Sequence, residues 1–172
     1  MQTSEKQIGF SIIELMVTIL IASLLLTVGV PSFASLIANN RITSQANELV
    51  SGLNLARSEA FTRGQRVTIC SSTDGDSCAA DTDWATGWIV FNDADGDGVV
   101  ANVSDILREW EAVTGDTTLT GSVNFVTYQG NGSVNAAANF NMTIPNGSTS
   151  QTRRICIALA GNNWVNRPSS NC

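Results

Sequence analysis

The sequence of 172 residues contains no histidine and a single lysine, Lys6. Histidine is the commonest general base and metal ligand near neutral pH, so its absence excludes the usual nucleophile–base pairs. Beyond Lys6 the chain has no lysine amine for a Schiff base, and it has no glycine-rich phosphate-binding loop. No two carboxylates stand out by their spacing as a catalytic pair. We therefore expect a protein that is not an enzyme.

Basic residues are scarce and unevenly placed. Nine Lys and Arg stand against 15 Asp and Glu, a net charge of −6, so no general affinity for nucleic acid is expected. Residues 74–116 hold 11 acids and one arginine, a local net of −10. Residues 117–172 hold no acid and three arginines, a local net of +3, contributed by Arg153, Arg154 and Arg167.

The four cysteines form two pairs that are local in sequence, Cys70 with Cys78 and Cys156 with Cys172. Without histidine a zinc site would need all four thiolates, and the spacings fit zinc knuckles poorly. Two disulfides formed in an oxidising compartment are the better interpretation. Local pairing is favoured, while four cysteines allow three connectivities.

Charge is missing altogether from residues 15–40, and residues 15–30 are almost wholly apolar. At about 1.5 Å per residue, a helix over residues 10–37 is long enough to cross a bilayer. A secretory signal peptide would have a shorter apolar core that ends at a small-residue cleavage site. Here the apolar stretch continues into a patterned helix, so we expect it to be retained in the mature protein.

Beyond the apolar stretch, the spacing of apolar residues is typical of an amphipathic helix that packs on an apolar surface. We expect one helix over residues 10–63, which Gly29 and Pro31 kink or loosen and which Gly64 ends. The apolar positions, at spacings of three and four, are Ile42, Ala46, Leu49, Leu53, Ala56 and Ala60.

After Gly64 the pattern changes to short β-rich runs separated by Gly, Asn, Asp and Ser. This predicts an α+β fold in which the long N-terminal α-helix, half transmembrane and half amphipathic, packs on an antiparallel β-sheet. Trp88 and Trp110 are expected to pack in this domain rather than to bind a ligand. The expected strands are residues 66–71, 87–92, 106–113, 122–128, 140–144 and 154–159.

The stretch GFSIIEL, residues 9–15, resembles the type IV prepilin processing motif. A short polar leader with a lysine precedes Gly9, Phe10 follows the cut, and Glu14 stands at the fifth position of the mature chain. Pro31 falls where pilins commonly carry a helix-bending proline. The resemblance implies cleavage by a prepilin peptidase between Gly9 and Phe10.

Three further stretches resemble the GspH/FimT branch of minor pilins and pseudopilins, which includes FimU-like proteins. They are LARSEA (residues 55–60), VTIC (67–70) and GWIVFND (87–93). The domains implied are a leader peptide (1–9), a pilin helix (10–63) and a β-rich globular domain (64–172).

The resemblance implies a minor pilin that joins the tip or initiation complex and primes assembly of a type IV pilus. Its implied partners are other major and minor pilins, the prepilin peptidase, an inner-membrane assembly platform, and the membrane before assembly. The implied location is the inner membrane, as a single-pass protein with its globular domain in the periplasm, and then the extracellular pilus. A pseudopilin of a type II secretion system is the alternative within the same branch.

Glu14 is costly in a membrane segment, because an ionised carboxylate there costs about 2.5–3.5 kcal/mol on insertion scales. Cleavage after Gly9 would leave an α-amino group on Phe10. The resemblance to pilins implies that Glu14 pairs with such an amino group on a neighbouring subunit. The alternative is a glutamate at headgroup level that caps a plain anchor helix.

The run DADGDG, residues 93–98, follows the first half of an EF-hand loop. Asp93, Asp95 and Asp97 occupy positions 1, 3 and 5, and a glycine occupies position 6. Position 12 is Ser104 rather than glutamate. A calcium site and a solvated acidic hairpin tip both remain open, and no other cofactor is expected.

Some relatives in the FimT branch bind DNA through a C-terminal Gly-Arg-x-Arg motif. The comparable stretch here, AGNNWVNRP (residues 160–168), keeps Gly161 but lacks the first arginine. A pilus-associated DNA-binding subunit for natural transformation is a second hypothesis, which the missing arginine weakens. An acid-free tail with Trp164 as a stacking surface favours it, the acidic block disfavours it, and its candidate contacts are Arg153, Arg154 and Arg167.

Overall fold

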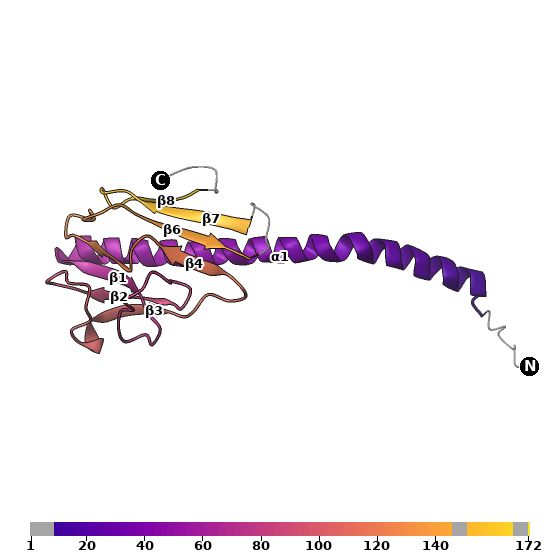
Figure 1. Cartoon of the computed structure of the whole chain (residues 1–172), viewed down its shortest axis with the longest axis horizontal. Helices are drawn as coiled ribbons and strands as arrows, with labels where there is room; N and C mark the ends of the chain where they lie inside the picture. The colour runs from indigo at the N-terminus through magenta and orange to yellow at the C-terminus, as the bar shows by residue number, and fades with distance from the viewer. Residues whose placement is uncertain (1–8, 146–150, 167–171) are drawn as a thin grey trace, which may run out of the picture. The chain divides into compact units, whose positions relative to one another are not determined.

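The computed structural model describes residues 9–145, 151–166 and 172, and it divides the chain into two compact units, Met1–Ile37 and Ala38–Cys172. One helix, α1 (Ile12–Arg63), begins in the first unit and ends in the second (Figure 1). The helix passes through Gly29 and Pro31 without a break. The expected helix of residues 10–63 is therefore confirmed to within two residues at its start.

In the first unit the apolar side chains of α1 are exposed; Phe33, for example, is 67% exposed. The helix is long and apolar enough to cross a membrane, by length and composition alone. Side chains of this kind are stable in lipid or against other apolar surfaces, not in water. The first unit thus has the properties of a membrane anchor.

In the second unit, the remainder of α1 is joined by two antiparallel sheets of four strands each, where the sequence predicted one sheet. The first sheet has the order β3-β2-β1-β5 and the second β4-β6-β7-β8. A 3₁₀ turn, η1 (Val103–Asp105), precedes β3. The strands are β1 (Val67–Ser71), β2 (Trp88–Asn92), β3 (Ile106–Trp110), β4 (Thr118–Gly121), β5 (Phe125–Tyr128), β6 (Ala138–Thr143), β7 (Thr152–Ile157) and β8 (Asn163–Asn166).

The strand predictions differ from the structure in four places. The expected strand over residues 122–128 is only β5, because Ser122–Asn124 turn between β4 and β5. The strands β4 and β8 were not expected at all, and β3 ends at Trp110 rather than at Val113. The other expected strands are present, with ends that shift by one or two residues.

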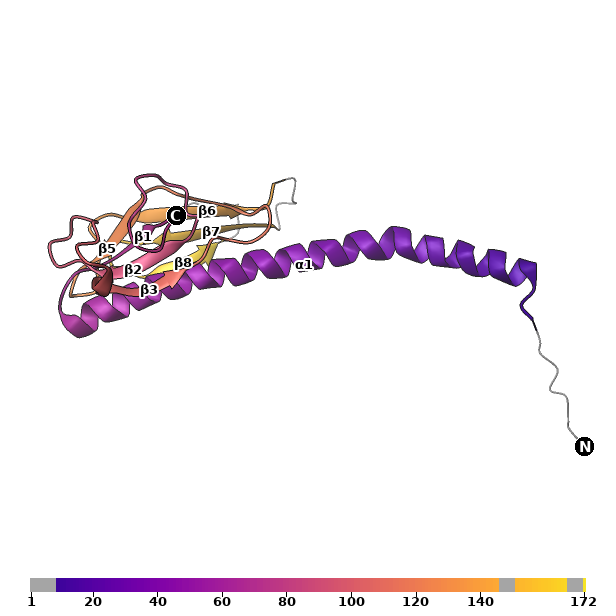
Figure 2. The ribbon, with the colours of Figure 1, turned by 90° about the horizontal axis from the view of Figure 1, so that it is seen from below.

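The segment Ala38–Arg63 of α1 lies along the line where the two sheets meet (Figures 1 and 2). Its predicted apolar face is at most 1% exposed and joins one core cluster with residues of both sheets. Because each sheet buries one face on the same helix, the helix holds the two sheets together. The helix residues in this cluster are Ile42, Ala46, Leu49, Leu53, Ala56 and Ala60.

At Gly52, α1 packs tightly on the first sheet. A Cβ atom there would lie 3.1 Å from Ile69 Cδ1 and 3.1 Å from Trp88 Nε1. Trp88 is buried and stacks on Trp110, with ring centroids 6.2 Å apart. Both tryptophans therefore pack between helix and sheet, as expected, and glycine at position 52 makes room for them.

Both disulfides join the pairs that are local in sequence, Cys70–Cys78 and Cys156–Cys172. The first ties the acidic loop after β1 back to β1, and the second ties the end of the chain to β7. The predicted pairing is confirmed. All four cysteines are in disulfides, so no free thiolate is available to bind zinc.

Candidate functional site

The processing stretch stands at the start of α1. Gly9 and Phe10 precede the helix, and Phe10 is 86% exposed. Glu14 lies in the first turn, where the positive end of the helix dipole favours a carboxylate. Its side chain is exposed, so a group on another molecule could reach it. Cleavage at Gly9–Phe10 and an assembly role for Glu14 stay predictions.

The DADGDG loop follows β2, and the buried carboxylate of Asp93 accepts hydrogen bonds from the loop and from β1. Asp93 is 2% exposed and accepts a hydrogen bond from Thr68 Oγ1 at 2.6 Å. It also accepts the backbone N–H groups of Gly96 at 2.8 Å and Gly98 at 3.1 Å. Both carboxylate oxygens of Asp93 are therefore engaged by the protein itself. Buried carboxylates are stable only when they are bonded in this way.

Arg66, which the sequence did not identify, also binds this loop, through the backbone carbonyl oxygens of the loop. Its Nη1 donates to the carbonyl oxygens of Ala94 at 2.9 Å and Asp95 at 3.2 Å. Antiparallel pairing of β1 and β2 brings Arg66 to the loop, since Asp93 N donates to Arg66 O. No local sequence signal marks this contact, because 28 residues separate Arg66 from Ala94.

The loop fits calcium only in part. One carboxylate oxygen from each of Asp93, Asp95 and Asp97 can be chosen so that the three lie within 4.8 Å of one another. The twelfth position, Ser104, lies in η1 and has no carboxylate, whereas EF-hand loops use a bidentate glutamate there. The Asp93 oxygens also already accept three hydrogen bonds. The arrangement favours a loop held by protein contacts.

The two arginines of the DNA-binding hypothesis lie next to each other on β7 but make separate contacts. Arg153 donates from Nη2 to Thr43 Oγ1 on α1 at 3.1 Å. Arg154 donates from Nε to Asn141 Oδ1 on β6 at 2.8 Å. Successive residues of a strand point to opposite faces of the sheet, so the pair does not form one patch. Arg167 lies outside the described residues.

The acidic block of residues 74–116 makes no ion pair between described residues. Within the described part of the chain, the only ion pair joins Arg63 Nε to Glu59 Oε2, at 2.7 Å. Hydrogen bonds from the Ser77 hydroxyl and the backbone N–H groups of Asp76 and Ser77 lower the pKa of Asp74 from 3.8 to about 2. Asp74 thereby holds together the loop that the first disulfide closes.

Tyr128, on β5, is a buried titratable group in the core of the second unit. Burial raises its pKa to about 12, which nearby Arg57 and Asn163 partly offset. The phenol is therefore neutral at every physiological pH. No catalytic group is indicated by this shift, since Tyr128 belongs to the apolar core.

A helix that is apolar and exposed at its start and packed on antiparallel sheets at its end defines a pilin-like protein. The family model described as type II transport protein GspH matches residues 45–161. The prokaryotic N-terminal methylation motif matches residues 5–30. Because the GspH model covers more than half of the sequence, the chain belongs to the GspH family. A comparison with curated protein sequences finds no match.

Solved structures of the same fold come from two filament systems. The type IV minor pilin FimU of Pseudomonas aeruginosa, in crystals of space group P21, is 25% identical with a TM-score of 0.61. That match covers 76% of this chain and 92% of FimU. The minor pseudopilin EpsH of the Vibrio cholerae type 2 secretion system is 11% identical with a TM-score of 0.52. It covers 76% of this chain and 99% of EpsH, and shows the fold alone.

Proposed function

We propose that this chain is a minor subunit of a type IV pilus that joins the tip or initiation complex and primes pilus assembly. The similarity to FimU over 92% of that minor pilin, at 25% identity, carries this proposal. The N-terminal methylation motif supports it, because its match over residues 5–30 includes the proposed processing stretch and the apolar start of α1. In this proposal the chain contributes contacts within the filament and no catalytic step.

Assembly exchanges one apolar environment for another. A prepilin peptidase removes residues 1–9, and the segment up to Ile37 then anchors the chain in the inner membrane, with the β-rich domain in the periplasm. An assembly platform moves the subunit into the growing filament, where helices of other major and minor pilins replace lipid around its exposed apolar side chains. The subunit then belongs to an extracellular pilus.

Glu14 supplies the polar contact in this exchange. In lipid its charge costs about 2.5–3.5 kcal/mol, and pairing with the α-amino group of a neighbouring subunit's first residue offsets that cost. The pair forms only when the incoming helix is at the correct height along its neighbours. Glu14 therefore favours one register of the subunit over all others.

The experiment compares Glu14→Ala with a matched control, Glu48→Ala, which replaces an exposed glutamate further along the same helix. Glu14→Ala should leave membrane insertion unchanged and reduce incorporation into sheared pili about tenfold or more, because the α-amino group of the neighbouring subunit would be buried without its carboxylate partner, and an unpaired buried charge costs about 3–5 kcal/mol. Glu48→Ala should behave as wild type. Incorporation of Glu14→Ala at the wild-type level would refute the pairing, and absence of the wild-type chain from pili would refute the proposed function.

A pseudopilin of a type II secretion system is the second candidate, because EpsH shares the fold. The two candidates differ in the machine that uses the subunit. Deleting the chain should abolish or reduce surface pili under the first proposal, and protein secretion under the second. The genes beside this one distinguish the candidates at less effort.

Pilus-borne DNA binding is less well supported. Its two described arginines each bond a neighbouring side chain and lie on opposite faces of β7. Mobility-shift titration of wild type against Arg154→Ala tests it, since a DNA site that uses this arginine would lose affinity and salt dependence. Equal binding of both proteins would remove Arg154 from any such site.

A further inference from the structure

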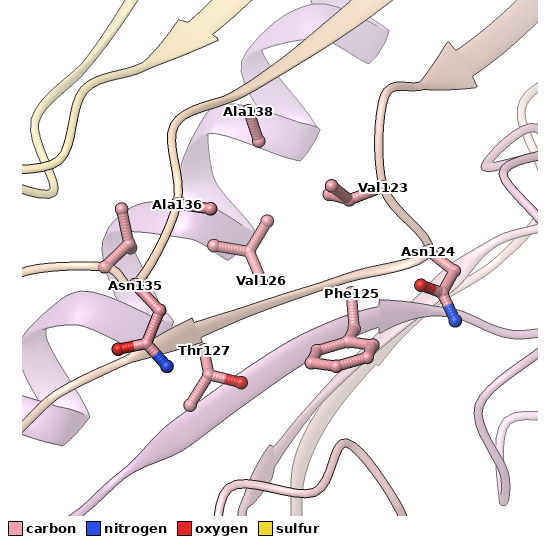
Figure 3. Close-up of a pocket in the computed structure, with 9 residues that line it drawn as sticks. Val123, Asn124, Phe125, Val126, Thr127, Asn135, Ala136 and Ala138 are labelled. Carbon is pink, nitrogen blue, oxygen red and sulfur yellow. The ribbon is translucent and has the colours of Figure 1, made fainter.

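A polar pocket of about 250 Å³ lies in the second unit, between α1 and the chain that links β3 to β4. Residues 112–114 form one side of it. The helix forms the other side with four polar side chains, Arg41, Ser44, Gln45 and Glu48. The pocket along β5 that Figure 3 shows has, by contrast, no charged residue in its lining. Of these two pockets, only the polar one offers charges to a ligand.

Arg41 brings to this pocket a guanidinium group that is held in place but not paired. A Cβ atom on Gly115 would collide with Arg41 Nη1 and lie 2.7 Å from Cζ, so the guanidinium group lies directly against this glycine. Among the described residues, no carboxylate forms an ion pair with Arg41, and its buried Nε has no hydrogen-bond partner. A buried donor without an acceptor is costly. This end of the pocket therefore favours an anion.

Gln45 presents an unpaired acceptor one helical turn further along α1. Its side chain is 4% exposed, and Nε2 donates to Thr114 O at 3.0 Å and to Thr114 Oγ1 at 3.1 Å. Because a carbonyl oxygen can only accept, these bonds fix which amide atom is the nitrogen. The buried Oε1 has no donor among the described residues. With the negative charge of Glu48 at the same pocket, this end favours a cation that carries N–H groups.

The position of the pocket in the sequence indicates a source for both charges. Arg41 is the first charged residue after the uncharged residues 15–40. At about 1.5 Å per residue, a helix of that length extends about 39 Å. A bilayer measures about 30 Å across its hydrocarbon and about 40–45 Å with its headgroups. When this segment spans the membrane, Arg41 therefore lies among the lipid headgroups.

We propose that the pocket binds the headgroup of a phospholipid with a primary ammonium group, phosphoethanolamine. Its phosphate accepts hydrogen bonds from the guanidinium group of Arg41, which suits phosphate oxygens, and from the hydroxyl of Ser44. Its ammonium, two carbons away, donates to Gln45 Oε1. The headgroup has about eight non-hydrogen atoms, which fit in 250 Å³ because even a water molecule occupies only about 30 Å³. This inference rests on the proposed anchoring of the chain in the membrane.

Selective retention of lipid by the full-length wild-type chain tests the chemistry of the site. The chain is reconstituted in vesicles of equal parts phosphatidylethanolamine, phosphatidylcholine and phosphatidylglycerol and extracted in mild detergent, and the bound lipid is identified by native mass spectrometry. Phosphatidylethanolamine should be retained about tenfold over the other two, because the choline nitrogen has no N–H group and glycerol has no positive charge. Equal retention of the three lipids would overturn the inference.

A charge-removing variant tests the assignment to this pocket. Arg41→Gln removes the group that binds the phosphate and should lower the retention of phosphatidylethanolamine about tenfold. The matched control is Arg63→Gln, which removes the same charge at an exposed position in the last turn of the same helix. With equal melting temperatures, the control should retain the lipid as wild type does. An equal loss in both variants, or no loss in Arg41→Gln, would overturn the inference.

Two further measurements identify the occupant. In detergent without lipid, short-chain phosphatidylethanolamine should raise the melting temperature of the wild-type chain more than free phosphoethanolamine at the same concentration, and an equal rise would overturn a lipid as the ligand. A photo-crosslinker at position 44 should attach to lipid in cells, and attachment to protein alone would overturn the inference. The lipid stays in the membrane when the subunit leaves it, so loss of lipid retention should leave incorporation into pili unchanged. Absence of the wild-type chain from pili would refute the proposed function, whereas lipid retention would still decide this inference.

Discussion

Replacing Asp93 by asparagine separates a loop held by protein contacts from a calcium site. The change keeps the shape of the side chain but removes its charge and one acceptor oxygen. That carboxylate accepts three hydrogen bonds at 2.6, 2.8 and 3.1 Å and is 2% exposed. Bonds to charged groups contribute about 1.5–3 kcal/mol each, and neutral ones about 0.5–1.5 kcal/mol. In the variant, the new amide also faces a glycine N–H group.

We expect Asp93→Asn to lower the free energy of unfolding by about 2–4 kcal/mol, which corresponds to a melting temperature roughly 10 °C lower. The control is Asp95→Asn, an exposed residue of the same loop, which should change stability by less than about 0.5 kcal/mol. Thermal unfolding of the full chain in detergent, with calcium and with chelator, measures both.

The two hypotheses for the loop differ in their response to calcium. A ligand that binds only the folded chain stabilises it as its concentration rises above Kd. If protein contacts hold the loop, the deficit of Asp93→Asn is the same with calcium and with chelator. An equal deficit in Asp95→Asn would refute the reasoning, and a deficit that appears only with calcium would refute it and indicate a metal site.

Three further predictions follow from packing, cross-linking and charge. Gly52→Leu should destabilise the second unit by about 1–3 kcal/mol in urea titration, because the new side chain has no space. The control Gly29→Leu should have no effect, because a Cβ atom at position 29 would meet no atom within 4 Å. Cys172→Ser opens a loop of sequence separation 16 and should cost about 3 kcal/mol under oxidising conditions only; an equal loss in reductant would contradict this. The lowered pKa of Asp74 adds stability above about pH 4 that is lost as the pH falls toward 2, so melts of Asp74→Asn should lack that part of the acid-induced decrease shown by wild type.

The helix and its buried face could be predicted from the sequence because their signals are periodic. Six apolar residues at helical spacing all lie in the core, and Gly64 adopts the left-handed conformation, with φ of 64°, directly after Arg63. The disulfides could be predicted as well, since short separations make local pairing favourable. In each case the determining residues lie close together along the chain.

The missing strands show where this reasoning fails. The strand β8 contains two asparagines in four residues, which single-residue preferences assign to a turn. Its pairing with β7 stabilises it instead. The turn between β4 and β5 lies within residues 122–128, which the β-rich composition predicts as one strand, although the carbonyl oxygen of Val123 accepts a bond from the indole of Trp84. Tertiary contacts decide both cases.

Among the candidate sites, too, some residues could be predicted from the sequence and others could not. The positions of Gly9, Phe10 and Glu14 follow from a contiguous motif. The role of Asp93 could not be predicted, because its partner Thr68 lies 25 residues away on another strand.

The two disulfides have a consequence for the chain under mechanical load. Each encloses a stretch that cannot extend when the domain is pulled apart, with separations of 8 and 16 residues and Cα–Cα distances of 5.6 and 5.5 Å. At about 3.4 Å per extended residue, the two disulfides together keep roughly 70 Å of the chain's contour length from extending. In a force-extension measurement, a reductant should lengthen the unfolding step by that amount, so a subunit in a tensed fibre resists elongation at both ends of its β-rich domain.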